Sequence, residues 1–270
     1  MDRTTILTNI YNEEYMLPFW LEYHKQVFDH GIIINWDSTD RSVEIIKKIC
    51  PTWEIRRTTN LVNDKPFFET FAADKEIMEI EKTVPGYKIF LNVTEWLITT
   101  KPIKELLNFN IKDNCYPLHV LTPINGLEGY TPPDAKHFIA CFRDKLIPVI
   151  NKRFFRYIFN RPCGEYKGGR HFTHVSTDLE KVDWVNYKPI NNGMYVVWCG
   201  FFPNTDEMWK RKLTVKNHMS REVELSRGTC FQHFWEIEEM KKDYINLCTN
   251  LPLNSYEMIR SLDYCISICP

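Results

Sequence analysis

The chain has no long hydrophobic run. None of its apolar stretches approaches the roughly 18–20 residues that a helix needs to cross a bilayer, so we expect no membrane span. Residues 1–4 also lack the apolar core of a secretory signal peptide. These two absences argue against an integral membrane protein and predict a cytoplasmic location.

Metal-binding cysteine pairs are missing as well. The 9 cysteines are odd in number and widely scattered, and none belongs to a C-x-x-C pair, which argues against a zinc site. Scattered thiols of this kind are typical of proteins in the reducing cytosol. The cysteine pattern therefore supports the cytoplasmic location.

Glycine is scarce, with only 10 residues in a chain of 270. No G-x-G-x-x-G motif follows the first predicted strand, which makes a Rossmann dehydrogenase or methyltransferase a weak interpretation. A sugar nucleotidyltransferase would fit an α/β sheet, but the chain lacks the glycine-rich phosphate loop that this class has near its N-terminus. A nucleotide would have to be held by its base and ribose.

Charge of one sign is not in excess. The 34 basic and 35 acidic residues give a net charge of −1, whereas nucleic-acid-binding domains are usually strongly basic. We therefore expect no nucleic-acid partner. Because 44% of the residues are hydrophobic and 14% are aromatic, the chain is predicted to fold as a well-packed globular protein.

Strand and helix patterns alternate through residue 100. The predicted strands are residues 4–10, 32–34, 53–57 and 88–91, and the helices between them begin at Pro18 and cover residues 42–50 and 71–82. Such alternation predicts a parallel sheet with helices on its faces. Residues 115–150 are strand-like and rich in proline, which predicts a mixed or antiparallel extension. Residues 231–247 are predicted to form one long amphipathic helix.

Polar side chains follow the first two predicted strands. Asn12, Glu13 and Glu14 come after the first strand, and Asp37 and Asp40 come after the second. Ligands of open α/β sheets bind at the carboxyl ends of the strands, so these groups are candidates to hold the base and ribose of a nucleotide. The alternative is that they stabilise the start of the next helix, through its dipole or by capping it.

A third polar cluster follows the fourth predicted strand and consists of Asn92, Thr94 and Glu95. Hydrophobic residues flank it on both sides, and a carboxylate in such surroundings is costly to bury without a partner. A divalent ion that bridges a diphosphate would provide that partner for Glu95. A structural salt bridge is the alternative.

A glycine-rich loop at residues 164–171 combines charged side chains with a histidine. It contains Arg170 and His171, and loops of this composition carry function more often than core segments do. The alternative is a surface turn that has no role in binding or catalysis.

A predicted helix near residue 206 begins with two carboxylates. Asp206 and Glu207 precede Arg211 by five and four residues, so a carboxylate here is a candidate general base with a phosphate-binding arginine nearby. An ion pair between residues four apart on one helix is the alternative. His233 stands alone in the sequence, and a lone histidine is usually structural.

Taken together, these segments resemble the glycosyltransferases of the GT-A fold, and in particular the family 2-like group with its bacterial and viral members. The resemblance is carried by "NEEYMLPFWLEYH", "IIINWDSTDRSVEII", "FLNVTEWLI", "CGEYKGGRHF" and "NTDEMWKRKLTV". It extends over about residues 5–235. The first two segments are specific in combination, and each of the later ones is moderately so.

The resemblance implies an α/β fold of the GT-A type, in which helices flank a mostly parallel, Rossmann-like sheet with a mixed extension on the acceptor side. It implies a single domain over residues 1–270, with a nucleotide-sugar-binding half at about 1–100, an acceptor half at about 101–235 and a C-terminal helical segment at about 236–270. The implied activity is transfer of a sugar, with inversion, from a UDP-, GDP- or dTDP-sugar. The acceptor would be a hydroxyl of a glycan or glycoconjugate.

By position, the resemblance also implies roles for the polar residues. Asn12, Glu14 and Asp37 would contact the nucleotide. Glu207 or Asp206 would be the general base that deprotonates the acceptor, and Glu95 and His233 would bind a metal ion. The diphosphate or the acceptor would be contacted by Asn92, Thr94, Arg170, His171 and Arg211.

The expected metal site departs from the family pattern. Family members usually present two aspartates after the fourth strand, and this chain has Asn92, Thr94 and Glu95 there. One carboxylate with neutral oxygens would bind Mn²⁺ or Mg²⁺ more weakly, and cations such as Arg170 and Arg211 could compensate. The alternative function is a catalytically weakened homologue that still binds a nucleotide or a glycan.

Overall fold

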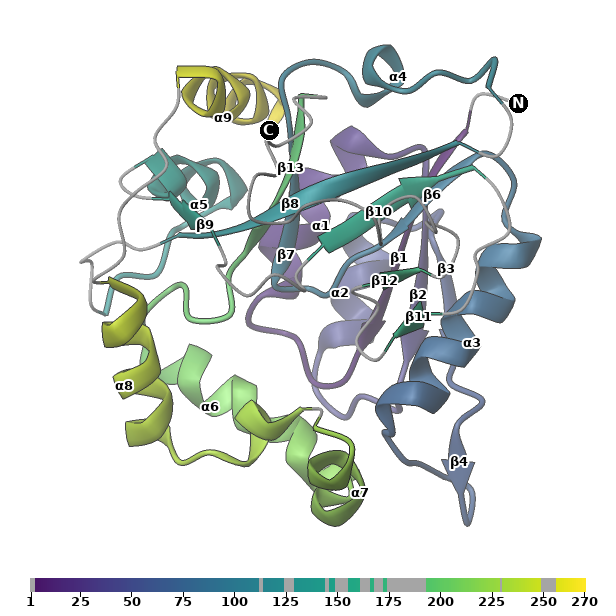
Figure 1. The fold of residues 1–270 in the computed structure, drawn as a ribbon, viewed down its shortest axis with the longest axis vertical. Helices are drawn as coiled ribbons and strands as arrows, with labels where there is room; N and C mark the ends of the chain where they lie inside the picture. The colour runs from purple at the N-terminus through teal and green to yellow at the C-terminus, as the bar shows by residue number, and fades with distance from the viewer. Residues whose placement is uncertain are drawn as a thin grey trace.

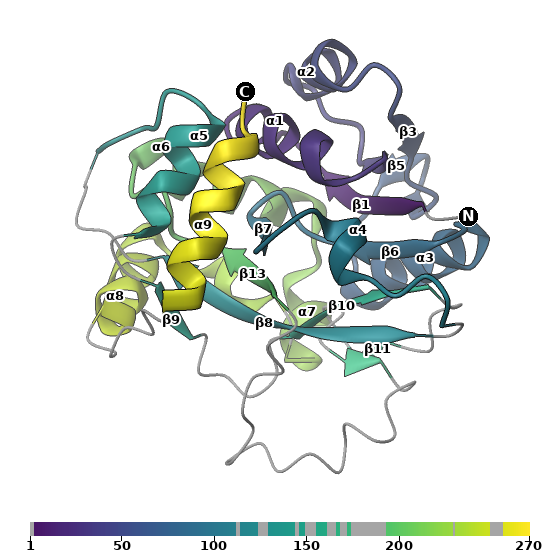
Figure 2. The same ribbon diagram turned by 90° about the horizontal axis from the view of Figure 1, so that it is seen from above.

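Helices lie on both faces of a central sheet in the computed structural model (Figures 1 and 2), which confirms the predicted α/β class. None of the helices in the described part of the chain is long and apolar enough to cross a membrane. The structure describes residues 3–111, 114–123, 129–143, 146–148, 155–160, 166–167, 172–173, 193–228, 230–248 and 256–270.

One half of the sheet is parallel. Its strands lie in the order β3-β2-β1-β6, and β1 pairs in parallel with both β2 and β6. The register places Leu7 opposite Ile32 on one side and opposite Phe90 on the other. The predicted parallel sheet is confirmed here. The four strands are β1 (Thr4–Ile10), β2 (His30–Asn35), β3 (Glu54–Arg57) and β6 (Tyr87–Phe90).

The other half of the sheet is mixed, as expected. Beyond β6 the order continues β10-β8-β13-β7, with β9 paired to β8. β10 runs antiparallel to β6 and β8, whereas β13 is parallel to β8 and antiparallel to β7. These strands are β7 (Glu95–Thr99), β8 (Cys115–Pro123), β9 (Leu146–Pro148), β10 (Phe155–Phe159) and β13 (Met194–Trp198). Two small hairpins are formed by β4 (Leu61–Val62) with β5 (Lys65–Pro66) and by β11 (Tyr166–Lys167) with β12 (Phe172–Thr173).

Helices cover the parallel strands on both faces, so these strands are apolar on both sides. The helices α1 (Leu17–Val27) and α2 (Ser42–Ile49) share one core with inward-facing strand residues that include Ile6 and Ile33. The helix α3 (Thr70–Thr83) packs with Leu7, Ile32 and other residues of the opposite face. Alternate strand residues therefore belong to different cores, as the period of two along a strand requires.

The second half of the chain contains helices that the sequence did not predict. Residues 115–150 were expected to be strand-like, but Asp134 caps a short helix there by accepting a hydrogen bond from the His137 N–H at 2.8 Å. The predicted helix at 231–247 is divided in two at residues 235–236. The helices that were predicted in this half are α6 (Asp206–Thr214), α8 (Ile237–Cys248) and, within the predicted C-terminal helical segment, α9 (Tyr256–Ile268). The others are α4 (Ile103–Leu106), α5 (Ala135–Ala140), α7 (Arg221–Ser226) and the 3-10 turns η1 (Cys141–Arg143), η2 (Val215–His218) and η3 (Phe231–Phe234).

His24 on α1 is fully buried and neutral in the folded protein. Its Nε2 accepts a hydrogen bond from the Leu97 N–H at 3.3 Å, so its Nδ1 carries the proton and donates to the Trp20 carbonyl at 2.9 Å. Burial lowers the pKa of His24 from 6.5 to about 3, because charging this imidazole would place a cation in an apolar core.

The buried imidazole predicts a loss of stability in mild acid. Between pH 6.5 and 3 the unfolded chain binds a proton at this residue that the folded chain does not, so stability falls as the pH is lowered. For His24 we expect a loss of roughly 2 kcal/mol between pH 7 and pH 5. Urea unfolding of the wild type and of His24→Gln at both pH values measures it. An equally steep pH dependence in the variant would contradict this origin.

Candidate functional site

The strand order reverses between β1 and β6. From β1 the chain adds β2 and then β3 on one side, and it then returns to place β6 on the other side of β1. Open α/β sheets bind ligands in the crevice outside the carboxyl ends of the strands at such a switch point. The loop after β1 contains Asn12, Glu13 and Glu14, and the turn after β6 contains Asn92 and Thr94. The fold therefore brings two of the predicted polar clusters to one edge.

The loops after β1 and β2 are joined by Asn12. Its Oδ1 accepts hydrogen bonds from the Thr39 N–H at 2.8 Å and the Asp40 N–H at 3.3 Å, and its own N–H donates to the Ser38 Oγ at 3.1 Å. Asn12 and Asp37 both have left-handed backbone, with φ of 52° and 55°, which is uncommon outside glycine. Two of the predicted nucleotide-binding residues, Asn12 and Asp37, thus lie in two loops that are joined by hydrogen bonds.

Two of the predicted nucleotide-binding carboxylates hold an arginine each in half-exposed ion pairs. The Arg57 guanidinium, at the end of β3, donates to Asp37 through Nε at 2.9 Å and Nη2 at 2.7 Å and thereby lowers the pKa of Asp37. Arg41 donates to the Glu14 carboxylate through its backbone N–H and its Nε at 3.2 and 3.1 Å. Exposed pairs of this kind exchange partners at little cost.

A third ion pair joins the loop after β1 to α6. The Arg211 guanidinium donates to both carboxylate oxygens of Glu13, 198 residues away in sequence, and each side chain is only 14% exposed. Burial raises the pKa of Glu13, although Arg211 opposes the shift. Arg211 is therefore directed at the switch point and does not take Glu207 as its partner. Glu13 was a candidate to hold the base or ribose, but its arginine partner on α6 could not be predicted from the sequence.

The start of α6 is fixed against the same loop. Thr205 caps the helix by accepting a hydrogen bond from the Met208 N–H at 3.2 Å, and its hydroxyl lies 2.8 Å from the Tyr15 hydroxyl. Asp206 and Glu207 are exposed in the first turn. Because residues four apart share a helix face, Glu207 lies on the face of α6 that Arg211 turns toward the β1 loop. Asp206 is displaced from that face by about 100° around the helix.

His233 in η3 is hydrogen-bonded to the backbone of α6 at Lys212. The Nδ1 of His233 donates to the Lys212 carbonyl at 3.0 Å, and burial lowers the pKa of His233 to about 4. The Lys212 ammonium lies 3.9 Å from the centroid of the Phe201 ring and donates to the Gly200 carbonyl, and burial lowers its pKa to about 7. The contact of His233 is thus a structural one, to the backbone of α6.

Glu95, at the start of β7, is enclosed in a buried ion pair, which is the alternative named for it above. Arg156 on β10 donates its Nε to Glu95 Oε2 at 3.0 Å and its Nη2 to Oε1 at 2.5 Å. The Asn92 N–H also donates to Oε2, at 2.8 Å. Both side chains are almost fully buried, at 3% and 4% exposure.

The residues at the β6–β7 turn do not fit a Mn²⁺ or Mg²⁺ site. Such ions need carboxylate oxygens that are free to coordinate, and both oxygens of Glu95 face a guanidinium. Thr94 and Asn92 offer neutral oxygens only. In the described part of the chain, no three His, Cys, Asp or Glu residues are grouped closely enough to hold a metal ion. Arg170 and His171 lie outside the described residues, and their roles stay predictions.

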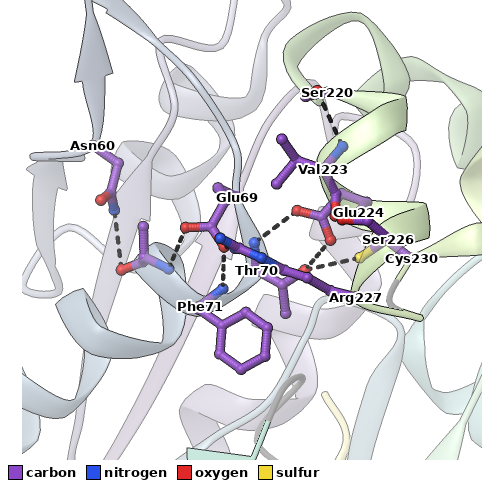
Figure 3. A network of polar contacts seen from close by, with 11 residues as sticks. Asn60, Glu69, Thr70, Phe71, Ser220, Val223, Glu224, Ser226, Arg227 and Cys230 are labelled. Atoms are coloured by element: carbon purple, nitrogen blue, oxygen red, sulfur yellow. Dashed lines mark hydrogen bonds and ion pairs between the residues drawn. The ribbon is translucent and has the colours of Figure 1, made fainter.

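A further buried carboxylate fastens α7 to the start of α3 (Figure 3). Glu224 accepts hydrogen bonds from the Thr70 N–H at 2.9 Å and the Thr70 hydroxyl at 2.7 Å. Beside it, Arg227 pairs with Glu69, the residue that caps α3. Together with the Glu13–Arg211 pair, this contact holds the α6–α7 segment along the edge where β1, β2 and β6 end (Figure 1).

An aromatic pair stands at the same edge. Tyr11, the residue after β1, meets the His218 ring edge-on at a centroid distance of 4.0 Å, and His218 is close enough to Asp37 to lower the pKa of that carboxyl. The backbone of His218 is fixed by the Phe68 N–H, which donates to its carbonyl at 2.7 Å. Sequence reasoning missed both rings, although Tyr11 directly precedes Asn12.

No family model matches the chain, and no curated protein matches it. Among solved structures, it is similar to S. aureus TarS 1–349 in complex with UDP, with 16% identity and a TM-score of 0.33 over 48% of this chain and 38% of that chain. It is also similar to glucosyl-3-phosphoglycerate synthase from Mycobacterium tuberculosis in complex with Mn²⁺, UDP and glucosyl-3-phosphoglycerate, with 14% identity and a TM-score of 0.33 over 59% of this chain and 57% of that chain. The chain spans less than two thirds of either structure.

Proposed function

We propose that the protein is a glycosyltransferase that uses a nucleotide sugar as its donor. The observation that carries the proposal is the set of polar side chains at the β1–β6 switch point, where open α/β sheets bind ligands. Asn12 and Asp37 hold their loops there in left-handed backbone. Residues with such sparsely populated backbone conformations cluster at active sites and ligand-binding sites, where the surrounding structure supports their strain.

In this proposal the nucleotide lies over the ends of β1 and β2. Asn12, Glu14 and Asp37 would contact the base and ribose of a UDP-, GDP- or dTDP-sugar. Tyr11 lies in the same loop with its ring against that of His218, and stacking on an aromatic side chain is a common way to hold a base. The diphosphate would then extend toward Asn92 and Thr94 at the end of β6.

The reaction would be a single displacement at the anomeric carbon. The acceptor hydroxyl loses its proton to a carboxylate base, its oxygen forms a bond to the anomeric carbon, and the bond from that carbon to the diphosphate breaks. The electron pair of that bond leaves with the nucleoside diphosphate, and configuration inverts. Arg211 would stabilise the negative charge that develops on the leaving diphosphate, because its guanidinium already lies at the switch point.

Glu207 is the proposed base, because it shares the helix face of Arg211. We expect Glu207→Gln to lower the rate of sugar transfer by about 10²–10⁴-fold, the usual contribution of a general base, without changing donor affinity. Asp206→Asn is the matched control, and it should retain activity. The donor is found first by thermal shift against UDP-, GDP- and dTDP-sugars, since a ligand raises the melting temperature of the protein it binds. Full activity in Glu207→Gln would remove Glu207 from this role.

A second function is favoured by one observation. The closed Glu95–Arg156 pair takes away the carboxylate that would hold a metal ion against the leaving diphosphate. A protein in this state could bind a nucleotide or a glycan without transferring the sugar. Calorimetry that shows nucleotide-sugar binding, together with no product over hours of incubation with candidate acceptors, would favour the binding protein over the enzyme.

A further inference from the structure

The ion pair at the end of β6 takes the place of a metal ion. β10 is antiparallel to β6, with Phe159 opposite Lys88. Arg156 comes three residues before Phe159 on β10, so it lies three residues beyond Lys88 in the direction of the carboxyl end of β6. Its guanidinium therefore reaches the turn that follows this strand, where it donates to both oxygens of Glu95. A fixed protein cation stands where the resemblance implies a divalent one.

The pair would be difficult to open for a metal ion. A divalent cation that approached Glu95 would meet the positive charge of Arg156 at close range, in surroundings that screen it weakly. Displacing Arg156 would leave a guanidinium buried at 4% exposure and without its carboxylate, which is strongly unfavourable. The Asn92 N–H occupies a further lone pair of the carboxylate. Metal binding would have to break three hydrogen bonds to gain one carboxylate.

Other cations are available at the same edge. Three of the carboxylates in the β1 and β2 loops hold an arginine each: Glu13 holds Arg211, Glu14 holds Arg41 and Asp37 holds Arg57. Arginine binds phosphate oxygens through two parallel N–H groups. The pairs of Arg41 and Arg57 are exposed at 74% and 53% for the arginine side chains, so these arginines can turn to an anionic ligand without opening a core.

We propose that this protein binds its donor without a divalent cation, and that arginines exchanged from these carboxylates neutralise the diphosphate. The inference rests on the proposed function, since it concerns the same site. It differs from the expectation of a weak Mn²⁺ or Mg²⁺ site in a measurable way: removing metal ions should leave nucleotide affinity unchanged.

Calorimetry with UDP as the probe tests the inference. The full chain is titrated with UDP after treatment with a chelator and again in excess MnCl₂, and we expect dissociation constants that agree within about twofold. In a parallel titration without nucleotide, MnCl₂ is added to the protein and the electron paramagnetic resonance signal of free Mn²⁺ is recorded. We expect no loss of this signal at equimolar protein.

The outcomes separate the inference from the function on which it rests. Binding of UDP only in the presence of Mn²⁺ would overturn the inference and leave the glycosyltransferase proposal standing. Uptake of Mn²⁺ by the protein alone would also overturn it. Failure of UDP, GDP and dTDP to bind under either condition would overturn the proposed function, and the inference with it. Equal UDP binding in both conditions supports both.

Discussion

Arg156→Met should lower the free energy of unfolding by about 3–5 kcal/mol, the usual cost of removing one member of a buried ion pair. The substitution keeps most of the side-chain volume but leaves the carboxylate of Glu95 at 3% exposure without the guanidinium. Equilibrium unfolding in urea measures the loss, because the midpoint moves while the slope reports the surface exposed. The effect is large because the buried Glu95 carboxylate loses both hydrogen bonds from the guanidinium.

Two further variants give this result its meaning. Arg57→Met removes an arginine from the exposed pair with Asp37, and we expect it to cost less than about 1 kcal/mol. The double variant Glu95→Gln with Arg156→Met removes both charges, so it should recover most of the stability that Arg156→Met alone loses. A loss in Arg156→Met no larger than that in Arg57→Met would mean that the pair is not closed as the structure shows.

The parallel half of the fold could be predicted from the sequence because its signals are local. Helical spacing after Pro18 predicts α1, and the β-branched run at residues 32–34 predicts β2. Each of these elements is fixed by residues within one or two turns of itself. The polar residues that follow the strands could be predicted as candidates for the same reason, since a parallel sheet brings all its carboxyl ends to one edge.

The partners of those residues could not be predicted, because they come from distant segments. Glu95 takes Arg156 from 61 residues away, and Glu13 takes Arg211 from 198 residues away. Sequence reasoning named Glu13, Glu95 and Arg211 as candidates. It could not pair them, because no periodicity connects an acidic residue with an arginine on another strand or helix. That connection depends on how β10 and α6 pack, which is a property of the whole fold.

The helices of the second half show the same limit. The short α5 depends on its cap at Asp134 and on packing of Phe138 against Trp96, with ring centroids 4.6 Å apart. Its six residues are too few to give a clear helical period, and isolated helices of this length are not stable by propensity alone. Tertiary contact decided the structure here.

Arg211→Gln should weaken UDP binding by about 10–100-fold, which corresponds to the loss of one or two hydrogen bonds to a charged group. If Arg211 turns from Glu13 to the diphosphate, its loss removes a phosphate contact and leaves the Glu13 carboxylate facing the phosphates. Lys210→Gln is the matched control. It removes the same charge from an exposed position on the same helix, and we expect its UDP affinity to stay within about twofold of the wild type.

Glu13→Gln should have the opposite effect and tighten UDP binding, because it frees the guanidinium from its competitor. The double variant Glu13→Gln with Arg211→Gln then separates two explanations. If Arg211 served only to neutralise Glu13 and fix α6, removing both charges would restore the affinity that Arg211→Gln loses. If Arg211 contacts the diphosphate, the double variant should remain weak. Calorimetry of all three variants with UDP, in the presence of a chelator, decides whether Arg211 has a purely structural role or binds the diphosphate.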